Sequence, residues 1–396
     1  MIQPFSIGKL PRIEFGSGSF AKLPGIAARY GQRLLLVTGA RSFLASPHAE
    51  TLFTQWRALG CHWDVVQVRG EPSPELVDAI VAEWRGTGIN AVIGIGGGSV
   101  LDAAKACAGL LVPGNSVMDH LEGVGPELPY RGPATPFIAV PTTAGTGSEA
   151  TKNAVLSRSG ADGFKKSFRD DQLMAQYAIV DPDLLAGCPA ELIAADGMDA
   201  YTQLLEAYVS LRANPLTDAL ALAGMKAVCD GLPTWYATGE NAAAARTQMA
   251  YASLLSGICL AQAGLGSVHG LAQPLGSLFP IPHGVVCGTL VAAATRVNIE
   301  VMQARDPGNP ALAKYADVGR LFSRDRHIDD AAARASLVDV LMEWTRTMQL
   351  PMLRALGISE EDLPRIIANC RGSSMKTNPV VLTDNEVERI LRMRIG

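Results

Sequence analysis

Charged residues are scarce in this sequence: Asp, Glu, Lys and Arg make up 18% of its 396 residues, and the net charge is −4. Because no run of basic residues appears, neither nucleic acid nor a membrane surface is expected as a partner. The chain also lacks an uninterrupted apolar stretch of 18 residues, so no transmembrane helix is predicted. Its N-terminal residues contain no apolar core of signal-peptide length, which favours a cytoplasmic protein.

Cysteine and histidine are also few. The seven cysteines are scattered and form no Cys-x-x-Cys pair, which is typical of buried thiols in a reducing cytoplasm. With only six histidines, every histidine-based site can be enumerated. Apolar residues, by contrast, reach 48%, enough to fill the cores of two or three domains. Low charge combined with long Ala/Leu-rich segments indicates buried subunit surface, so we expect a homodimer or larger homo-oligomer.

The two halves of the chain differ in their patterns. The first half alternates helical runs with short β-rich runs, and we predict strands at residues 33–39, 62–68, 90–99, 137–143 and 177–182. Such alternation predicts a parallel sheet covered by helices. From about residue 187, strand signals nearly vanish and Ala/Leu-rich helical segments follow. We therefore predict an α/β domain over residues 1–187 and a helical domain over residues 188–396.

Consecutive glycines, Gly96, Gly97 and Gly98, separate a predicted strand from a predicted helix. Glycine permits close backbone approach, and the free N–H groups where the helix begins, near Ser99, suit a pyrophosphate. The alternative is structural, because Ser99 and Asp102 form an S-x-x-D capping pattern that many helices use without a ligand.

A second loop, PTTAGTGSEAT (141–151), follows another apolar strand and is rich in hydroxyl groups. Hydroxyls and exposed amides suit a nucleotide at the carboxyl ends of parallel strands. A polar surface loop with Ser/Thr turns is the alternative. Two such loops, each after a strand of one sheet, favour nucleotide binding.

A helical stretch, GMDAYTQLLEAY (197–208), carries an acid and an amide, Asp199 and Gln203, four residues apart. Positions i and i+4 share one helix face, a common spacing for two metal ligands, although glutamine is a poor ligand. His269 and His283 lie in the same half, each beside a glycine. One Asp and two His form a suitable ligand set for Fe²⁺ or Zn²⁺. An amphipathic helix that happens to carry an acid and an amide is the alternative.

The chain resembles the iron-containing (group III) alcohol dehydrogenase family nearly end to end. Six motifs carry the resemblance in the family's order: FGSGSFAKLP, GGGSVLDAAK, PTTAGTGSEAT, AIVDPDLL, GMDAYTQLLEAYVS and HGLAQPLG…IPHG. The resemblance implies the fold shared with dehydroquinate synthase-like proteins, an α/β dinucleotide-binding domain followed by an all-α domain. It also implies an NAD(P)(H)-dependent enzyme that interconverts a small alcohol and its aldehyde or ketone, assisted by a divalent metal and assembled as an oligomer.

The resemblance also assigns residues of a metal site. The family's metal ligands fall on Asp199, His269 and His283, and a further histidine ligand of the family falls on Gln203. We expect Gln203 either to offer a weak amide oxygen to the metal or to hydrogen-bond a ligating water. Another family histidine, near the nicotinamide and often assigned to proton relay, falls on Gln273. Because glutamine occupies two imidazole positions, two alternatives stay open. One is a metal-independent NAD(P)H reductase on the same scaffold, and the other is a catalytically impaired nucleotide-binding homologue.

For the cofactor, the resemblance assigns a pyrophosphate loop, a threonine-rich segment, a lysine and a polar residue near the adenosine. These residues are Gly97, Gly98, Ser99, Thr142, Thr143, Thr146, Thr151, Asn153, Lys165 and Ser73. Relatives that prefer NAD often have an aspartate where Gly39 stands. Without that carboxylate a 2′-phosphate meets no repulsion, and Arg41 is placed to pair with it, so we expect NADP(H) to be accepted.

Overall fold

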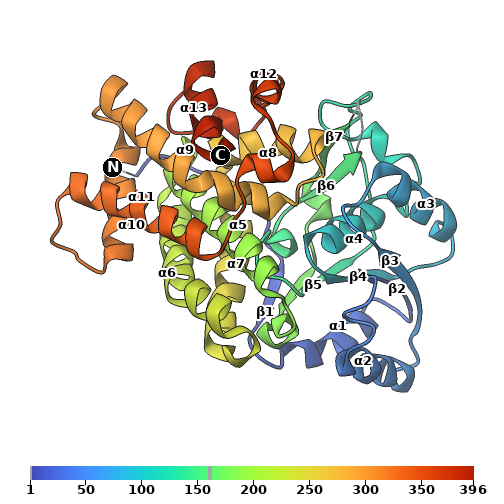
Figure 1. The fold of residues 1–396 in the computed structure, drawn as a ribbon. Coiled ribbons are helices and arrows are strands. Elements are labelled where there is room, and N and C mark those ends of the chain that lie inside the picture. Colours follow the sequence, from blue (N-terminus) through green and yellow to red (C-terminus); the bar gives the residue numbers. More distant parts are fainter. Residues whose placement is uncertain (1, 159–162) are drawn as a thin grey trace. The chain divides into compact units, whose positions relative to one another are not determined.

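The computed structural model describes residues 2–158 and 163–396, except for the side chain of residue 240 (Figure 1). The chain divides into two compact units. One unit is Gly8–Ala186, and the other is Gly187–Gly396 together with the N-terminal segment that ends at Ile7.

A six-stranded, fully parallel sheet forms the centre of the first unit. Its order is β1-β8-β5-β4-β2-β3, with bounds β1 Arg12–Phe15, β2 Arg33–Gly39, β3 His62–Val68, β4 Ala91–Gly96, β5 Phe137–Pro141 and β8 Tyr177–Val180. All five predicted strands are confirmed. The sixth, β1, escaped prediction because its sequence, RIEF, has only four residues, two of them charged.

Helices cover both faces of this sheet (Figure 1), as the α/β prediction requires. Their bounds are α1 Leu23–Ala28, α2 Pro47–Ala58, α3 Pro74–Trp84 and α4 Gly98–Leu110, with short 3₁₀ turns at Ser19–Lys22, Val117–Asp119, Ser148–Ala150, Asp171–Leu173 and Pro182–Leu185. In β2, Leu34 and Leu36 belong to the core beneath α1 and α2, whereas Leu35 and Val37 belong to the core beneath α3 and α4. Burial on both faces explains why the central strands are continuous apolar runs.

The chain reverses its direction of winding between β2 and β4. β2 pairs with β3 on one side and with β4 on the other, in parallel register. The carboxyl ends of these strands, Gly39 and Gly96, therefore lie at a topological switch point, where open α/β sheets bind their ligands.

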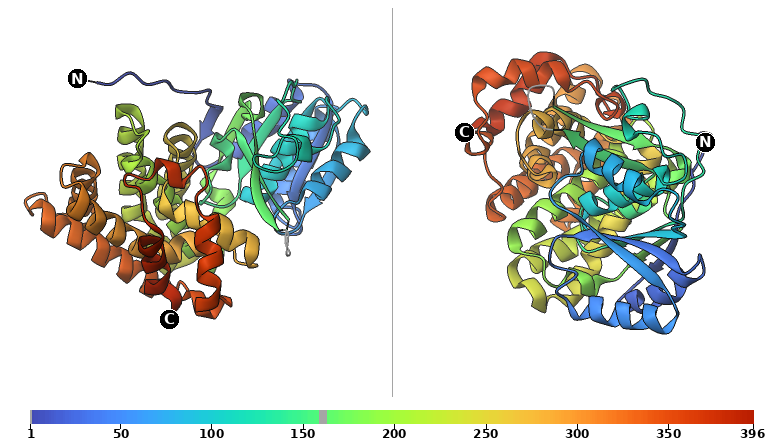
Figure 2. Two further views of the ribbon diagram at one scale, coloured as in Figure 1. Left: turned by 90° about the horizontal axis from the view of Figure 1, so that it is seen from above. Right: turned by 90° about the vertical axis from the view of Figure 1, so that its right-hand side faces the viewer.

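A two-stranded antiparallel hairpin, β6 Asn153–Arg158 and β7 Phe164–Arg169, follows the threonine-rich loop. Figure 2 shows these strands side by side in green. The sequence did not predict them, because FKKSFR carries three cations and has none of the apolar alternation of a half-buried strand.

The second unit is helical throughout its described residues (Figure 2), as predicted. Its helices are α5 Ala190–Val209, α6 Pro215–Thr238, α7 Ala243–Ala263, α8 Ser267–Leu278, α9 His283–Arg305, α10 Pro310–Ser323, α11 Asp330–Thr347, α12 Leu363–Asn369 and α13 Asp384–Ile395, with 3₁₀ turns at Gly239–Asn241, Leu353–Leu356, Glu360–Asp362 and Met375–Thr377.

Among the residues that the structure describes, one helix, α9, is long and apolar enough to cross a membrane. α7 and α8 together meet the same test, but this pair is bent by 99°. The apolar window of α9 is 83% buried inside the protein. α9 packs against α5, α8, α11 and α13. Its hydropathy is therefore that of a core helix.

Candidate metal and nucleotide sites

Four potential ligand atoms converge inside the helical unit. They belong to Asp199 on α5, His269 on α8, and His283 and Cys287 on α9, and all lie within 4.8 Å of one another. Asp199 Oδ1 is 3.3 Å from His269 Nε2 and 3.8 Å from His283 Nε2. The structure thus brings together the three residues to which the sequence assigned a metal, and it adds Cys287.

The carboxylate of Asp199 is charged and buried, and within the described part of the chain an aligned hydrogen-bond donor faces only one of its two oxygens. Its exposure is 1%, and among the described residues no aligned donor gives a hydrogen bond to Oδ1. Burial alone would raise the pKa of Asp199, but the imidazoles of His283 and His269 lower it to about 2. A buried acceptor without a donor is costly, and a cation among these four atoms would satisfy it.

Glu206 was missed by the sequence analysis, although it lies one turn beyond Gln203 on α5. Its buried carboxylate accepts hydrogen bonds from the N–H groups of Gly266 (2.9 Å) and Val268 (2.6 Å), where α8 begins. It is also 2.7 Å from His269 Nδ1. By fixing Nδ1, Glu206 turns Nε2 of the same ring toward Asp199, which is how an outer-shell carboxylate orients a ligand imidazole. The signal in the sequence was the i, i+4, i+7 spacing with Asp199 and Gln203.

Gln203 and Gln273, the two glutamines at positions where the family has histidine, have different surroundings. Gln203 is buried; its Nε2 donates to Asp199 Oδ2 at 3.3 Å, and its Oε1 accepts from Ser256 at 2.9 Å. Gln203 therefore fixes the orientation of the Asp199 carboxylate through Oδ2, the oxygen that does not face the imidazoles. Gln273 is one turn beyond His269 on α8, and its Oε1 is so close to Gly372 that a Cβ on Gly372 would be 2.5 Å away.

In the α/β unit, the two predicted nucleotide loops pack against each other where α4 begins. A Cβ on Gly97 would lie 3.2 Å from the side chain of Thr143, and a Cβ on Gly98 would lie 2.7 Å from that of Thr146. These glycines are therefore required by the close approach of the second loop. The N–H groups of Val100 and Leu101 already donate to the Gly97 carbonyl. Those of Gly98 and Ser99, which precede them, have no acceptor within the helix and suit an anion.

The capping alternative for Ser99 and Asp102 is wrong. The N-cap of α4 is Gly97, and no side chain caps the helix. The Asp102 carboxylate instead accepts hydrogen bonds from Ser148 Oγ at 2.6 Å and from Val155 N at 3.0 Å. Asp102 thus joins α4 to the threonine-rich loop and to β6.

Lys105 lies three residues after Asp102 on α4 and is fully buried. Nothing in the sequence indicated its role. Its Nζ donates to the Ser148 carbonyl (2.8 Å), Thr151 Oγ1 (2.9 Å) and the Asn153 carbonyl (2.8 Å). Burial lowers the pKa of Lys105 to about 8, against the opposing charges of Asp102 and Glu149. The predicted cofactor residues Thr151 and Asn153 therefore face this lysine.

Comparison with known proteins matches both units to one family. Residues 11–182 match the family described as "Iron-containing alcohol dehydrogenase", and residues 193–395 match "Fe-containing alcohol dehydrogenase family, C-terminal". The chain belongs to the iron-containing alcohol dehydrogenase family. The family resemblance and the fold class predicted from the sequence are therefore confirmed.

Individual relatives agree with this assignment. The chain is 33% identical to a 1,3-propanediol dehydrogenase of Citrobacter freundii over 372 residues, 91% of each chain. It is 34% identical to alcohol dehydrogenase 4 of Saccharomyces cerevisiae over 76% of this chain and 75% of that one. It is 31% identical to an NAD-dependent methanol dehydrogenase of Bacillus methanolicus over 81% of each. A crystal structure of 1,3-propanediol oxidoreductase superimposes with a TM-score of 0.86 at 28% identity, covering 99% of this chain and 100% of that one.

Membership makes this protein an oxidoreductase, an NAD-dependent alcohol dehydrogenase. The family's cofactors are a divalent metal, iron, and NAD. The donor set described above fits such an ion, because a buried carboxylate oxygen and two imidazole nitrogens converge on one point.

The remaining predicted cofactor residues of this alcohol dehydrogenase have the following places. Gly39 ends β2, and a Cβ there would meet only Val100, at 4.0 Å, so a side chain fits. Thr142 donates its N–H to the Gly96 carbonyl at 3.0 Å. Ser73 is the N-cap of α3, and Lys165 on β7 pairs with Glu71. Ser73 and Lys165 therefore already have structural partners.

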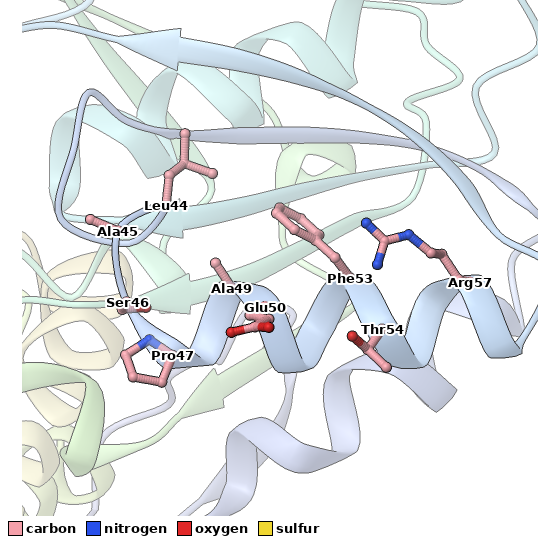
Figure 3. A pocket seen from close by; sticks show the side chains of 9 residues that line it. All are labelled: Leu44, Ala45, Ser46, Pro47, Ala49, Glu50, Phe53, Thr54 and Arg57. Atoms are coloured by element: carbon pink, nitrogen blue, oxygen red, sulfur yellow. The ribbon is translucent and has the colours of Figure 1, made fainter.

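A surface pocket of the α/β unit runs along α2 (Figure 3). Its lining is Leu44, Ala45, Ser46, Pro47, Ala49, Glu50, Phe53, Thr54 and Arg57. None of these nine residues belongs to the metal group or to the nucleotide loops, so the pocket plays no part in the assignment of either site.

Proposed function

We propose that this alcohol dehydrogenase holds one divalent ion per chain, Fe²⁺ or Zn²⁺, through Asp199, His269 and His283. The supporting observation is the buried Asp199 Oδ1, which faces two imidazole nitrogens and no aligned donor among the described residues. When bound, such an ion supplies a Lewis acid that polarises the oxygen of the alcohol or aldehyde.

Two further residues of the chain orient the proposed metal ligands. Gln203 holds Oδ2 of Asp199, so that Oδ1 is directed at the imidazoles. Glu206 holds Nδ1 of His269, so that the opposite nitrogen faces the same point. Gln273 cannot exchange a proton near neutral pH. We therefore propose that the substrate's proton travels through water or a hydroxyl of the cofactor ribose.

For the nucleotide, we propose that the pyrophosphate binds the N-terminus of α4 at Gly97, Gly98 and Ser99, beside the threonine-rich loop. The position at the switch point of the sheet supports this. We further propose that NADP(H) is accepted beside NAD(H), because Gly39 carries no carboxylate to repel a 2′-phosphate.

We propose small, uncharged alcohols and aldehydes as substrates. Residues 276–284, GSLFPIPHG, are mostly apolar and lead directly into the metal group at His283. Methanol and 1,3-propanediol, in the names of two relatives, are small alcohols of this class. A panel of short aldehydes with NADH and NADPH tests this assignment.

The test of the metal is elemental analysis of the parent and of His283→Ala, combined with activity. We expect one ion per chain in the parent and loss of the ion in the variant. kcat/KM should fall roughly a thousandfold, about 4 kcal/mol, because Lewis-acid stabilisation is worth several kcal/mol. An exposed histidine, His327, supplies the control His327→Ala, which should keep both metal and activity.

Two results would contradict the metal proposal: full activity after exhaustive chelation, and turnover by His283→Ala at the parent's rate. Both would favour the metal-independent reductase. Nucleotide binding without turnover on the whole panel would instead favour the catalytically impaired homologue.

We also propose that the protein is a homodimer or a larger closed oligomer. Large apolar side chains of the helical unit are exposed in the single chain, among them Val381 at 80% and Leu211 at 65%. A second copy would cover such surface. Sedimentation should give at least twice 41.7 kDa at micromolar concentration, and a mass near 41.7 kDa would contradict the proposal.

A further inference from the structure

Cys287 is the one member of the four-atom group that the family pattern did not assign. It lies one turn after His283 on α9, so the two side chains share a helix face. Its side chain is fully buried, and its Sγ is 3.7 Å from His269 Nε2 and 3.7 Å from His283 Nε2. The thiol is therefore equally close to both imidazole ligands.

Four of the six separations among these atoms are close to the edges of a coordination tetrahedron, and the other two are at most 4.8 Å. With metal–N and metal–O bonds near 2.0–2.1 Å and metal–S near 2.3 Å, tetrahedral edges are ~3.3 Å between N or O ligands and ~3.5 Å between S and N. The observed separations are 3.3 and 3.8 Å from Asp199 Oδ1 to the imidazoles, and 3.7 Å from Sγ to each of them. These four separations exceed the tetrahedral edges by at most a few tenths of an ångström.

Gln203, which occupies the family's remaining imidazole position, is already committed at both ends of its amide. Its nitrogen donates to Asp199, and its oxygen accepts from Ser256. To ligate an ion it would have to give up one buried hydrogen bond, which is costly. The contacts that the Cys287 sulfur would exchange for a metal bond are those with His269 and His283, which are themselves proposed ligands.

We propose that Cys287 binds the divalent ion as a thiolate, together with Asp199, His269 and His283. This rests on the proposed metal function. The count of four protein ligands is preserved, with a sulfur from α9 in place of the imidazole at position 203, and the substrate oxygen would enter as a fifth ligand. The metal–sulfur bond forms as the thiol proton is released to solvent.

A thiolate changes which metal the site retains. Sulfur is a soft ligand, which favours Zn²⁺ over Fe²⁺ or Mn²⁺ beyond the ordinary order of affinities. Of the ions this family uses, we therefore expect Zn²⁺ to be held most tightly here. Replacement of the sulfur by a hydroxyl should shift the balance back toward harder ions.

The test is reconstitution of the full-length apoprotein with Co²⁺ alone, followed by absorption spectroscopy. A thiolate bound to Co²⁺ gives an intense sulfur-to-metal charge-transfer band in the near ultraviolet, which Asp and His ligands do not give. We expect this band in the parent, its loss in Cys287→Ser, and at least a tenfold loss of Co²⁺ affinity in competition with a chelator. The matched control is Cys259→Ser, a buried thiol on α7 that bonds the Thr217 carbonyl; this variant should keep the band.

The outcomes separate this proposal from the one on which it rests. A parent that binds one Co²⁺ per chain without the charge-transfer band overturns the thiolate ligand and leaves the Asp–His–His site intact. A parent that binds no Co²⁺ overturns both. A band that persists in Cys287→Ser also overturns the assignment. Because the parent's spectrum is decisive by itself, the test survives a variant that fails to fold.

Discussion

The two candidate sites of this alcohol dehydrogenase are made of different kinds of atoms. The nucleotide site consists of main-chain N–H groups, glycines and hydroxyls within two strand-to-loop segments of one sheet. The metal group consists of individual side-chain atoms delivered by three helices, α5, α8 and α9. The first is therefore specified by local sequence, whereas the second depends on the identity of single residues far apart in the chain.

In each site, one buried charged residue hydrogen-bonds to the segments that carry the site and fixes their positions. In the α/β unit it is the cation Lys105, which ties α4 to the threonine-rich loop. In the helical unit it is the anion Glu206, which fixes the start of α8 and the ring of His269. Variants of Lys105 should therefore impair the nucleotide site and leave the metal group intact, and variants of Glu206 should do the reverse.

The largest expected effect comes from Lys105→Met. It removes a buried cation that lies 3.8 Å from Asp102 and leaves that carboxylate without a counter-charge. Breaking such a buried pair costs about 3–5 kcal/mol of unfolding free energy. Because the threonine-rich loop also loses its anchor, the KM for NADH should rise tenfold or more, while metal content per chain stays at the parent's value. Denaturant unfolding, steady-state kinetics and elemental analysis measure the three quantities.

Lys152→Met is the matched control for Lys105, since Lys152 is partly exposed and pairs with Asp171 at the surface of the same unit. Its unfolding free energy should change by no more than about 0.5 kcal/mol. If Lys105→Met lowered the metal content as much as it raised the KM for NADH, the two sites would not be separately supported.

A smaller effect is expected for Glu206→Gln. The amide keeps the size of the side chain, but Gly266 N–H and Val268 N–H donate to different oxygens of the carboxylate, so the NH₂ group of glutamine would face one of these two donors. Loss of an outer-shell partner typically costs 10–100-fold in metal affinity, so we expect a drop in that range with unchanged NADH affinity. Chelator competition and nucleotide titration measure the two.

The control for Glu206 is Glu300→Gln, at an exposed carboxylate on α9 that pairs with Arg389. It should leave metal affinity unchanged. An unchanged affinity in Glu206→Gln as well would show that orientation of His269 does not depend on this carboxylate.

The contrast between the sites also explains what could be predicted from the sequence. The strands at 33–39 and 62–68 have the predicted bounds, because continuous apolar runs between turn residues are a local signal. The glycine loop lies where predicted for the same reason. Ligand chemistry suggested that Asp199, His269 and His283 belong together, but only the family resemblance assigned them to one site, since periodicity alone does not tell which helices meet.

What escaped prediction depends on tertiary contacts. Lys105 appeared to be one lysine in an Ala-rich helix, and nothing local showed that Ser148, Thr151 and Asn153 would converge on it. Cys287 was grouped with the other thiols as a buried apolar residue. Its different role follows only from the packing of α8 against α9, which sets its sulfur beside two imidazoles.

The smallest expected effect concerns Gly39, where the nucleotide site, otherwise built from backbone, would gain one charged side chain. A Cβ fits there, so Gly39→Asp should fold. A carboxylate at the end of β2 accepts hydrogen bonds from the adenosine ribose and repels a 2′-phosphate. We expect the ratio of kcat/KM for NADPH to that for NADH to fall about tenfold, ~1.4 kcal/mol. Gly39→Asn keeps the shape without the charge and should change the ratio less. Arg41 is exposed two residues after Gly39. If it pairs with the 2′-phosphate, the contact is worth roughly 1.5–3 kcal/mol. Arg41→Ala should therefore weaken the binding of NADPH and leave the binding of NADH unchanged. A parent that already favours NADH by a hundredfold, about 2.7 kcal/mol, would rule out acceptance of NADP(H) and with it the role of Gly39.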